Sequence, residues 1–268
     1  MQAILWLPFP LFVLIILAIS VFCVLAGLGL VLLLRRLGGP LGERLPQATF
    51  VSVTATAWAL SLGFAASDIF ALNGKADQAA LEERSSVMRI LGTAAPEALN
   101  LPEMHRIVAD YSEAVLELEA GANRNRAAAP EVEALLQELR VEIIAMRRHG
   151  IADVIIGKTV RDFDELQDAR NARLAVGQSA VDDTKWYLVF ALSLLTALNI
   201  GLVNAHAPKA ARNALAIYGT ALFLCVVILG INSDPYRTMR LNLPQIDPAA
   251  SVEDGSPAEV DTASPEGV

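Results

Sequence analysis

Four long apolar segments are separated by charged stretches along this chain of 268 residues. Asp, Glu, Lys and Arg are all absent from residues 1–34, 45–67, 186–208 and 213–233. A helix needs about 20 apolar residues, at ~1.5 Å of rise each, to cross the hydrocarbon layer of a bilayer. Each segment is long enough, so the pattern predicts four transmembrane helices, arranged as two pairs.

The stretch between the two pairs, residues 73–185, is charged, with 14 Lys or Arg and 20 Asp or Glu residues. Its apolar residues recur at helical spacing, as in Val132, Leu136, Leu139 and Ile143. No part of it alternates apolar and polar residues as a half-buried strand would. We therefore expect a soluble insert of four helices, at about 75–94, 102–119, 130–148 and 151–180.

These patterns predict an all-α, polytopic membrane protein in which two transmembrane hairpins flank a helical insert. The first hairpin is expected at 1–72, the insert at 73–185 and the second hairpin at 186–233. Residues 234–268 are acidic, and from about Pro244 they are rich in Pro, Ser, Ala, Asp and Glu. Such a composition buries too little apolar surface to fold, so a disordered tail is predicted.

The overall composition agrees with a membrane protein and limits its partners. Charged residues make up 19% of the chain and the mean hydropathy is +0.46, whereas about a quarter of a soluble domain is charged. The lipid bilayer is therefore the first expected partner. The net charge of −8 and the pI of about 5.0 argue against nucleic acid, which attracts basic surfaces.

The sequence shows no motif for catalysis or for cofactor binding. A phosphate-binding loop, a dinucleotide fingerprint, a nucleophile elbow and a Cys-x-x-Cys pair are all absent. His105, His149 and His206 lie far apart and lack the spacing of metal ligands. Cys23 and Cys225 lie inside apolar segments, where free cysteines behave as small buried hydrophobes. We expect no enzyme activity, no cofactor and no metal site.

The second apolar segment, residues 45–72, is the most polar of the four. Its small residues recur every four positions and form one narrow stripe on a helix, which consists of Ala55, Ala59, Gly63 and Ser67. In lipid such a stripe lets another helix approach closely, so a packing role is expected. The alternative is the wall of a pore, and the candidate lining residues are Ser52, Thr56, Ala59, Gly63, Ser67 and Asp68.

Asp68 has two interpretations of its own. An ionisable residue within a span can line an ion path, and an acid at the mouth of a pore favours cations over anions. Because Asp68 lies near the end of the segment, its charge can also reach headgroups and water. The interfacial position is the expectation, and the ion path is the alternative.

Two further groups of charged residues are expected to be structural. Glu82 and Glu83 are adjacent, so on a helix they point about 100° apart and do not converge on one proton or metal. We expect both on a solvated face. Arg170, Arg173 and Asp182–Asp183 precede the third span and are expected to form an interfacial charge belt, with binding of lipid headgroups or a partner as the alternative.

Basic residues in the short loops predict the orientation of the spans, because such loops tend to stay cytoplasmic. The two loops that carry them contain Arg35, Arg36 and Arg44, and Lys209 and Arg212. Both loops are expected inside, which places the insert on the extracytoplasmic side. Three basic residues at the opposite ends of the spans, Lys75, Arg237 and Arg240, favour the reverse.

Three short motifs accompany the spans. They are Ser61-Leu-Gly-Phe64 followed by Glu82-Glu83-Arg84, Arg170-x-x-Arg173-Leu174 before Trp186, and Asp234-Pro235-Tyr236. Together they resemble the bacterial bestrophin-like domain family of membrane proteins, which has no established function. Members often carry an acid-aromatic signature in the middle region, but here no Trp accompanies Glu117 and Glu119. The resemblance covers most of residues 45–245 and implies a multi-pass protein of the bacterial inner membrane.

The family name connects this layout with the true bestrophins, which are pentameric anion channels whose second helix lines the pore. By that resemblance the second span would be the pore helix of a homo-oligomer, with Phe50, Trp58 and Phe64 as candidates for a constriction. The central domain of bestrophins faces the cytosol, opposite to the orientation that the loop charges favour. Two hypotheses follow: a non-enzymatic scaffold or sensor whose insert binds an unidentified protein partner, and, as the alternative, an oligomeric bestrophin-like ion channel.

Overall fold

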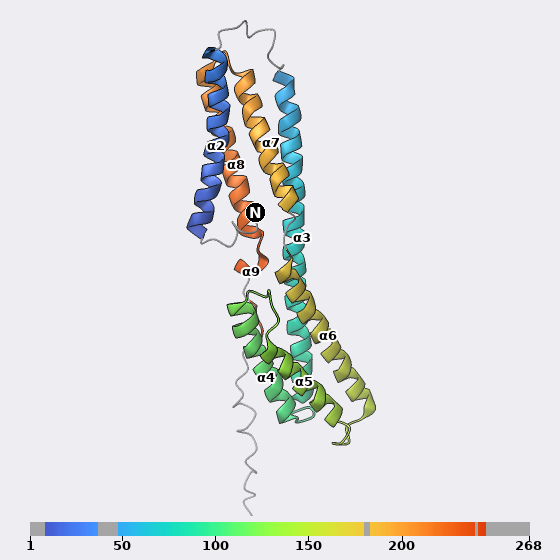
Figure 1. Cartoon of the computed structure of the whole chain (residues 1–268). Coiled ribbons are helices and arrows are strands. Elements are labelled where there is room, and N and C mark those ends of the chain that lie inside the picture. The colour runs from blue at the N-terminus through green and yellow to red at the C-terminus, as the bar shows by residue number, and fades with distance from the viewer. Residues whose placement is uncertain (1–8, 37–47, 180–182, 239–240, 245–268) are drawn as a thin grey trace, which may run out of the picture. The chain divides into compact units, whose positions relative to one another are not determined.

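The computed structural model describes residues 9–36, 48–179, 183–238 and 241–244 (Figure 1). Within these residues the regular structure is helical throughout, with no strand, which confirms the predicted all-α class. The chain divides into two compact units. Of the described residues, 9–36, 48–77, 175–179 and 183–238 form the spanning unit, and 78–174 and 241–244 form the insert unit.

The spanning unit contains the four candidate transmembrane helices. They are α2 (Phe9–Arg36), the first part of α3 (Ala48–Ala94), α7 (Asp183–Val203) and α8 (Pro208–Asn232). All four are long and apolar enough to cross a membrane, as predicted. Glycines bring α2 and α7 together: a Cβ atom added to Gly201 would lie 2.6 Å from the carbonyl oxygen of Gly27.

The first pair of spans does not pack as the predicted hairpin. Helix α2 packs along α7 and α8, and Figure 1 shows these two helices between α2 and α3, its neighbour in sequence. The buried side of α2 explains this choice, because Phe12, Ile16 and Cys23 share a core cluster with Leu222 and Val226 of α8. The turn that the sequence places around Gly38 and Pro40 lies outside the described residues.

Helix α3 is continuous where the sequence predicted a break between a span and a helix starting near Lys75. It runs without interruption for 47 residues. One glycine inside a helix costs only about 1 kcal/mol relative to alanine, so Gly74 does not end it. The side-chain amide of Asn73 donates to the carbonyl of Ile69 in the preceding turn and to the carbonyl of Asn232 at the end of α8, both at 3.0 Å.

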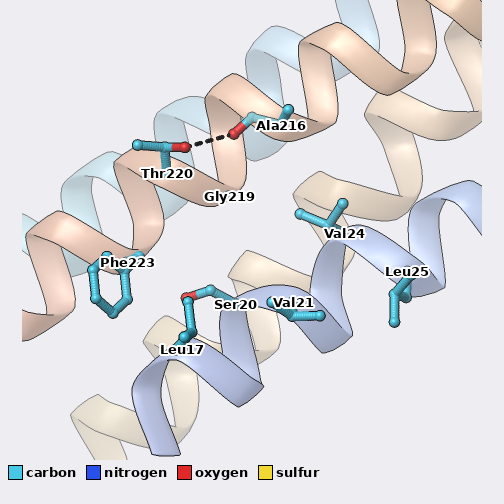
Figure 2. Close-up of a pocket in the computed structure, with 9 residues that line it drawn as sticks. All are labelled: Leu17, Ser20, Val21, Val24, Leu25, Ala216, Gly219, Thr220 and Phe223. Atoms are coloured by element: carbon cyan, nitrogen blue, oxygen red, sulfur yellow. Dashed lines mark hydrogen bonds between the residues drawn. The ribbon is translucent and has the colours of Figure 1, made fainter. Parts of the chain in front are cut away.

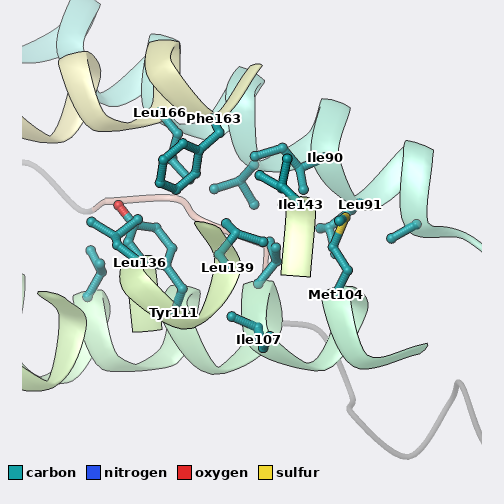
Figure 3. Close-up of a cluster of buried hydrophobic side chains, with 14 of the residues drawn as sticks. Ile90, Leu91, Met104, Ile107, Tyr111, Leu136, Leu139, Ile143, Phe163 and Leu166 are labelled. Carbon is teal, nitrogen blue, oxygen red and sulfur yellow. The ribbon is translucent and has the colours of Figure 1, made fainter. Parts of the chain in front are cut away.

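The insert unit is built around one apolar core. The end of α3 packs there with α4 (Pro102–Ala114), the π-helix η2 (Val115–Ala122), α5 (Pro130–Ala145) and the first part of α6 (Asp153–Gln178). Figure 3 shows the side chains that meet in this core. The predicted helical face of α5 is buried as expected, with Val132, Leu136, Leu139 and Ile143 each at most 3% exposed.

The beginning of the predicted disordered tail is folded, which corrects the assignment of residues 234–238 and 241–244. Pro235–Thr238 form the short helix α9, and Tyr236 is buried with Ala76 and Val176. Leu243 is buried in the core of the insert unit. These apolar residues were overlooked because they are sparse in a polar stretch. The rest of the predicted tail, residues 245–268, lies outside the described residues.

Candidate functional site

One face of α3 carries a row of small and polar side chains that stays exposed. The row consists of Ser52, Thr56, Ala59, Gly63 and Ser67, and all five residues are exposed in the single chain. Steps of three or four residues keep them on one side of the helix. A Cβ atom added to Gly63 would meet no atom within 4 Å, so the row faces open space. We call these five residues the α3 row.

The opposite face of α3 holds the helix against the rest of the spanning unit. Ser61, Ala65 and Ile69 are buried on that face. The Trp58 ring meets the Tyr218 ring edge to face, with the centroids 5.4 Å apart. These contacts cover little of the helix: 11% of the most apolar window of α3 is buried, against 28–33% for the other three spans.

The packing stripe deduced from the sequence overlaps the α3 row. Ala55 is half-buried, whereas Ala59, Gly63 and Ser67 are exposed, so no helix in the described part of the chain covers most of the stripe. If the stripe packs against another helix, that helix therefore belongs to a second molecule. Packing against a second copy and lining of a pore both stay predictions.

Aromatic residues flank the row or continue it. Phe64 is 66% exposed and directly follows Gly63, so it flanks the row. Phe50 is 56% exposed, but it lies two residues before Ser52 and therefore points to the side of α3 away from the row. Trp58 points away from the row, against Tyr218, so none of the three constriction candidates lies on the row itself. Phe70 was missed as a candidate, although it follows Ser67 by three residues and is 59% exposed, in line with the row.

Asp68 forms an ion pair with Lys185 at the start of α7. Both side chains are about two-fifths exposed, and the interfacial position of Asp68 stays a prediction. On the helix, Asp68 is turned by about 100° from Ser67, away from the row and toward Lys185. The ammonium group of Lys185 neutralises the negative charge of Asp68 locally. The argument that an acid at the pore mouth would disfavour anions is therefore weaker.

A second feature, inside the insert unit, is a network of fully buried charges centred on Arg173 of α6. Its Nε lies 2.5 Å from Glu83 Oε2 and its Nη2 lies 3.1 Å from Glu83 Oε1. The same guanidinium donates to Glu119 at 2.7 Å and to the Asn125 side-chain oxygen. The Tyr111 hydroxyl donates to Glu83 at 2.7 Å.

Arg170, one turn before Arg173, extends this network to the surface. It donates to Glu119 through Nη2 at 2.6 Å and through Nε at 3.2 Å. It also contacts Glu133 at 2.9 Å, and the side chain of Glu133 is 52% exposed. The network thus links α3, η2, α5 and α6. Two carboxylates and two guanidiniums are buried together, a balance that charges taken out of water require.

The electrostatic surroundings keep the members of the network in fixed protonation states. Burial alone would raise the pKa of Glu119, but the hydrogen bonds from Arg170 and from the Ala129 N–H, with the charge of Arg173, outweigh it and lower that pKa. Burial, together with the neighbouring Glu83 carboxylate, raises the pKa of Tyr111 well above its usual value. Tyr111 therefore stays a hydroxyl donor and Glu119 stays ionised at neutral pH.

Local backbone geometry brings Glu119 and Asn125 to this network. Glu119 lies in the π-helix η2, and π-helical turns often occur at functional positions. Two consecutive residues after η2, Arg124 and Asn125, have φ values of +48° and +58°, a region that asparagine tolerates better than most residues. The chain thereby turns back over Glu119, whose carboxylate accepts the Ala129 N–H at 3.0 Å.

Two expectations about these charges were wrong. Glu83 is 0% exposed, not on a solvated face, whereas its neighbour Glu82 is exposed as expected. Arg170 and Arg173 are 3% and 0% exposed, so they form an internal network and not an interfacial belt. The spacing held a usable signal, because Arg170 and Arg173 share a face with the apolar positions Phe163 and Leu166, both of which are buried.

The spanning unit also has an apolar groove between α2 and α8, with a volume of about 240 Å³ (Figure 2). Its two hydroxyl groups are satisfied within their own helices, since Ser20 donates to the Ile16 carbonyl and Thr220 donates to the Ala216 carbonyl, both at 2.9 Å. Gly219 permits the approach of the two helices, because an added Cβ atom would lie 2.5 Å from Val24. The groove therefore offers hydrocarbon contacts and no polar recognition.

A family model described as the Bestrophin-like domain matches residues 20–237, well over half of the sequence. The chain belongs to the Bestrophin-like domain family. This confirms the resemblance that the three motifs indicated. No curated protein matches the sequence.

Solved structures of a bacterial bestrophin homologue from Klebsiella pneumoniae share the fold. A structure of one variant has a TM-score of 0.64 at 16% identity and covers 88% of this chain and 93% of its own. The structure of a second variant has a TM-score of 0.62 at 18% identity, and the match covers 86% of this chain and 94% of the variant's chain. At such identities the likeness concerns the fold.

Proposed function

We propose that this Bestrophin-like domain protein is an oligomeric ion channel whose pore is lined by the α3 row. The observation that carries the proposal is the exposure of Ser52, Thr56, Ala59, Gly63 and Ser67 on the transmembrane helix that its own chain covers least. Hydroxyl groups on a span can bond to water along a hydrated axis, and the small side chains beside them leave room for such an axis.

The family favours the channel over the scaffold or sensor that the sequence first suggested. Both hypotheses are compatible with a non-enzymatic membrane protein. Bestrophins are channels, and the fold of this chain matches a bestrophin homologue over most of both chains. In a ring of copies, each α3 would turn its row to the axis and its flank, with Phe64, to a neighbour.

The pore proposed here is wide along the row and narrows at one end. The five row positions carry hydroxyl groups, a methyl group or hydrogen, whereas Phe70 continues the same face with an aromatic ring that is 59% exposed. A ring of phenylalanines can gate a pore by excluding water. Phe70 is therefore our candidate for the constriction, in place of Trp58.

The loop charges favour an extracytoplasmic insert, whereas the bestrophin layout favours a cytoplasmic insert. We adopt the bestrophin layout, with the insert in the cytoplasm of a bacterial inner membrane, because Lys75, Arg237 and Arg240 at the insert ends of the spans weaken the loop argument. A reporter inserted after Asn123, in an exposed turn, is expected to be active only as a cytoplasmic fusion. Activity of a periplasmic reporter there would restore the extracytoplasmic insert.

Flux and cysteine accessibility test the channel. The purified protein in liposomes should pass Cl⁻, Na⁺ or K⁺, and a charged thiol reagent should block this flux in Ala59→Cys. Phe64→Cys is the matched control on the flank, and the unmodified chain gives the background from Cys23 and Cys225. Absence of flux for all three ions, or equal block from both positions, would refute the pore assignment.

A further inference from the structure

The insert unit has a groove between α4 and α5 whose floor is apolar and whose rim is acidic. Its volume is about 420 Å³, and it is lined by Glu103 and Ile107 of α4 and by Gln137, Glu138, Val141 and Glu142 of α5. Val141 is 62% exposed although it lies on a helix of the insert core. Ile144, three residues further on the same face of α5, is also 62% exposed.

The rim carries an excess of negative charge. Arg106 is the cation between the carboxylates: it contacts Glu103 at 2.7 Å, Asp110 at 2.5 Å and Glu138 at 3.8 Å. Its hydrogen bond to Glu103 lowers the pKa of that carboxyl, so Glu103 is ionised at neutral pH. With Glu142, one arginine stands among four carboxylates, and the surface around the exposed valine keeps a net negative charge.

The charge pattern has a direction along α5. Glu138 and Glu142 lie beside Val141, whereas Arg148 lies one turn beyond Ile144 and is exposed. The acidic rim therefore ends at the Ile144 side. A ligand that matches this surface needs cations at Glu138 and Glu142 and apolar side chains over Val141 and Ile144.

The C-terminal residues of this chain do not match the groove. Residues 245–268 contain six Asp or Glu and no Lys or Arg, so they would be repelled by the rim. From the charge complementarity we infer that the groove between α4 and α5 binds a basic amphipathic segment of a partner protein, with apolar anchors on Val141 and Ile144 and cations on Glu138 and Glu142. Helical segments commonly dock in this way, with anchors three or four residues apart. This docking site does not depend on ion conduction.

A peptide probe tests the site on the full chain. The probe is a short synthetic helix with two leucines three positions apart, flanked by lysines. It is titrated by fluorescence anisotropy against the protein in zwitterionic nanodiscs, and the signal of empty nanodiscs is subtracted. We expect saturable binding that weakens by about tenfold or more in the double variant Glu138→Lys, Glu142→Lys, and also in Val141→Ser, Ile144→Ser.

The control has the same change of net charge elsewhere on the insert unit. Glu117 and Asp164 are exposed and do not line the groove, so Glu117→Lys, Asp164→Lys should keep the affinity of the unmodified chain. All substituted positions are exposed or half-exposed, and the helix content measured by circular dichroism should stay constant in every variant.

Three results would overturn the inference. Equal loss of binding in the groove and control variants would mean attraction to the overall negative charge. Equal binding of a probe with glutamates in place of lysines would remove the charge argument. A change of oligomer mass in the groove variants, measured by mass photometry, would make the groove a contact between copies of this chain.

Discussion

Glu83 of α3 and Arg173 of α6 form a two-point contact, at 2.5 and 3.1 Å, in which both side chains are 0% exposed. They are 90 positions apart in the sequence. Because each ion has lost its water, each depends on the other for compensation. This pair therefore fixes how the end of α3 lies against α6 inside the insert unit.

Removing one partner of this pair should be costly. We expect Glu83→Gln to destabilise the insert unit by about 3–5 kcal/mol, since Arg173 would keep a buried charge without its main counter-ion. Glu82→Gln is the matched control, and at an exposed position it should change stability by less than ~0.5 kcal/mol. Thermal unfolding of the purified variants, followed by circular dichroism, compares the two. Similar melting temperatures for both variants would contradict the buried network.

The lowered pKa of Glu119 predicts a dependence of stability on acid. A carboxyl group with a lower pKa in the folded state than its unfolded value of ~4.3 adds stability above that value. This contribution is lost as the pH falls through the folded pKa, because the unfolded chain then binds the proton first. Stability should be flat near neutral pH and fall below about pH 4. Glu119→Gln should be less stable at pH 7 and show a shallower decline in acid.

Two glycines give a paired test of the α3 row. Gly63→Ile should fold, because nothing lies within 4 Å of its added Cβ atom in the single chain, but it should reduce ion flux by about tenfold or more by narrowing the pore. Gly201→Ile should prevent the protein from folding, because the added Cβ atom would lie 2.6 Å from the Gly27 carbonyl oxygen. Yield, melting temperature and liposome flux separate the two effects. Full flux through a well-folded Gly63→Ile protein would exclude the row as the pore wall.

Charge substitutions on adjacent residues separate the pore from its surroundings. Ser67→Asp places a carboxylate on the row, so the reversal potential in a salt gradient should shift toward cations. Asp68→Asn removes a carboxylate that faces Lys185 and should shift the reversal potential much less. The opposite order of effects would place Asp68, and not Ser67, on the conduction path.

Much of the architecture could be predicted because long apolar runs and helical periodicity are local signals. The four spans and the core face of α5 followed from them directly. The packing of α2 on α7 and α8 could not, since the deciding contacts, such as that between Gly27 and Gly201, join residues distant in sequence. The continuity of α3 across Gly74 was not predicted either, and the contact of Asn73 with the Asn232 carbonyl at the end of α8 also joins residues distant in sequence.

The charges were harder to place than the apolar residues. A glutamate or an arginine is usually exposed unless it is paired, and the partners of Glu83 and Arg173 lie on other helices. The π-helix that carries Glu119 and the left-handed residues Arg124 and Asn125 have no clear sequence signature either. The α3 row was visible as a stripe of small residues, but its exposure became evident only from the packing of the opposite face, with Trp58 on Tyr218.

Both α3 and α6 cross the division between the two units, since the boundaries at 77/78 and 174/175 fall inside these helices. The insert is therefore not a module that can be excised and expressed alone. Cutting at either boundary would expose backbone N–H and C=O groups that now bond within a helix. An expression fragment, or a chimera with another member of the family, should keep both helices whole and exchange sequence in the turns around Asn100 or Gly150, where the backbone already leaves helical geometry.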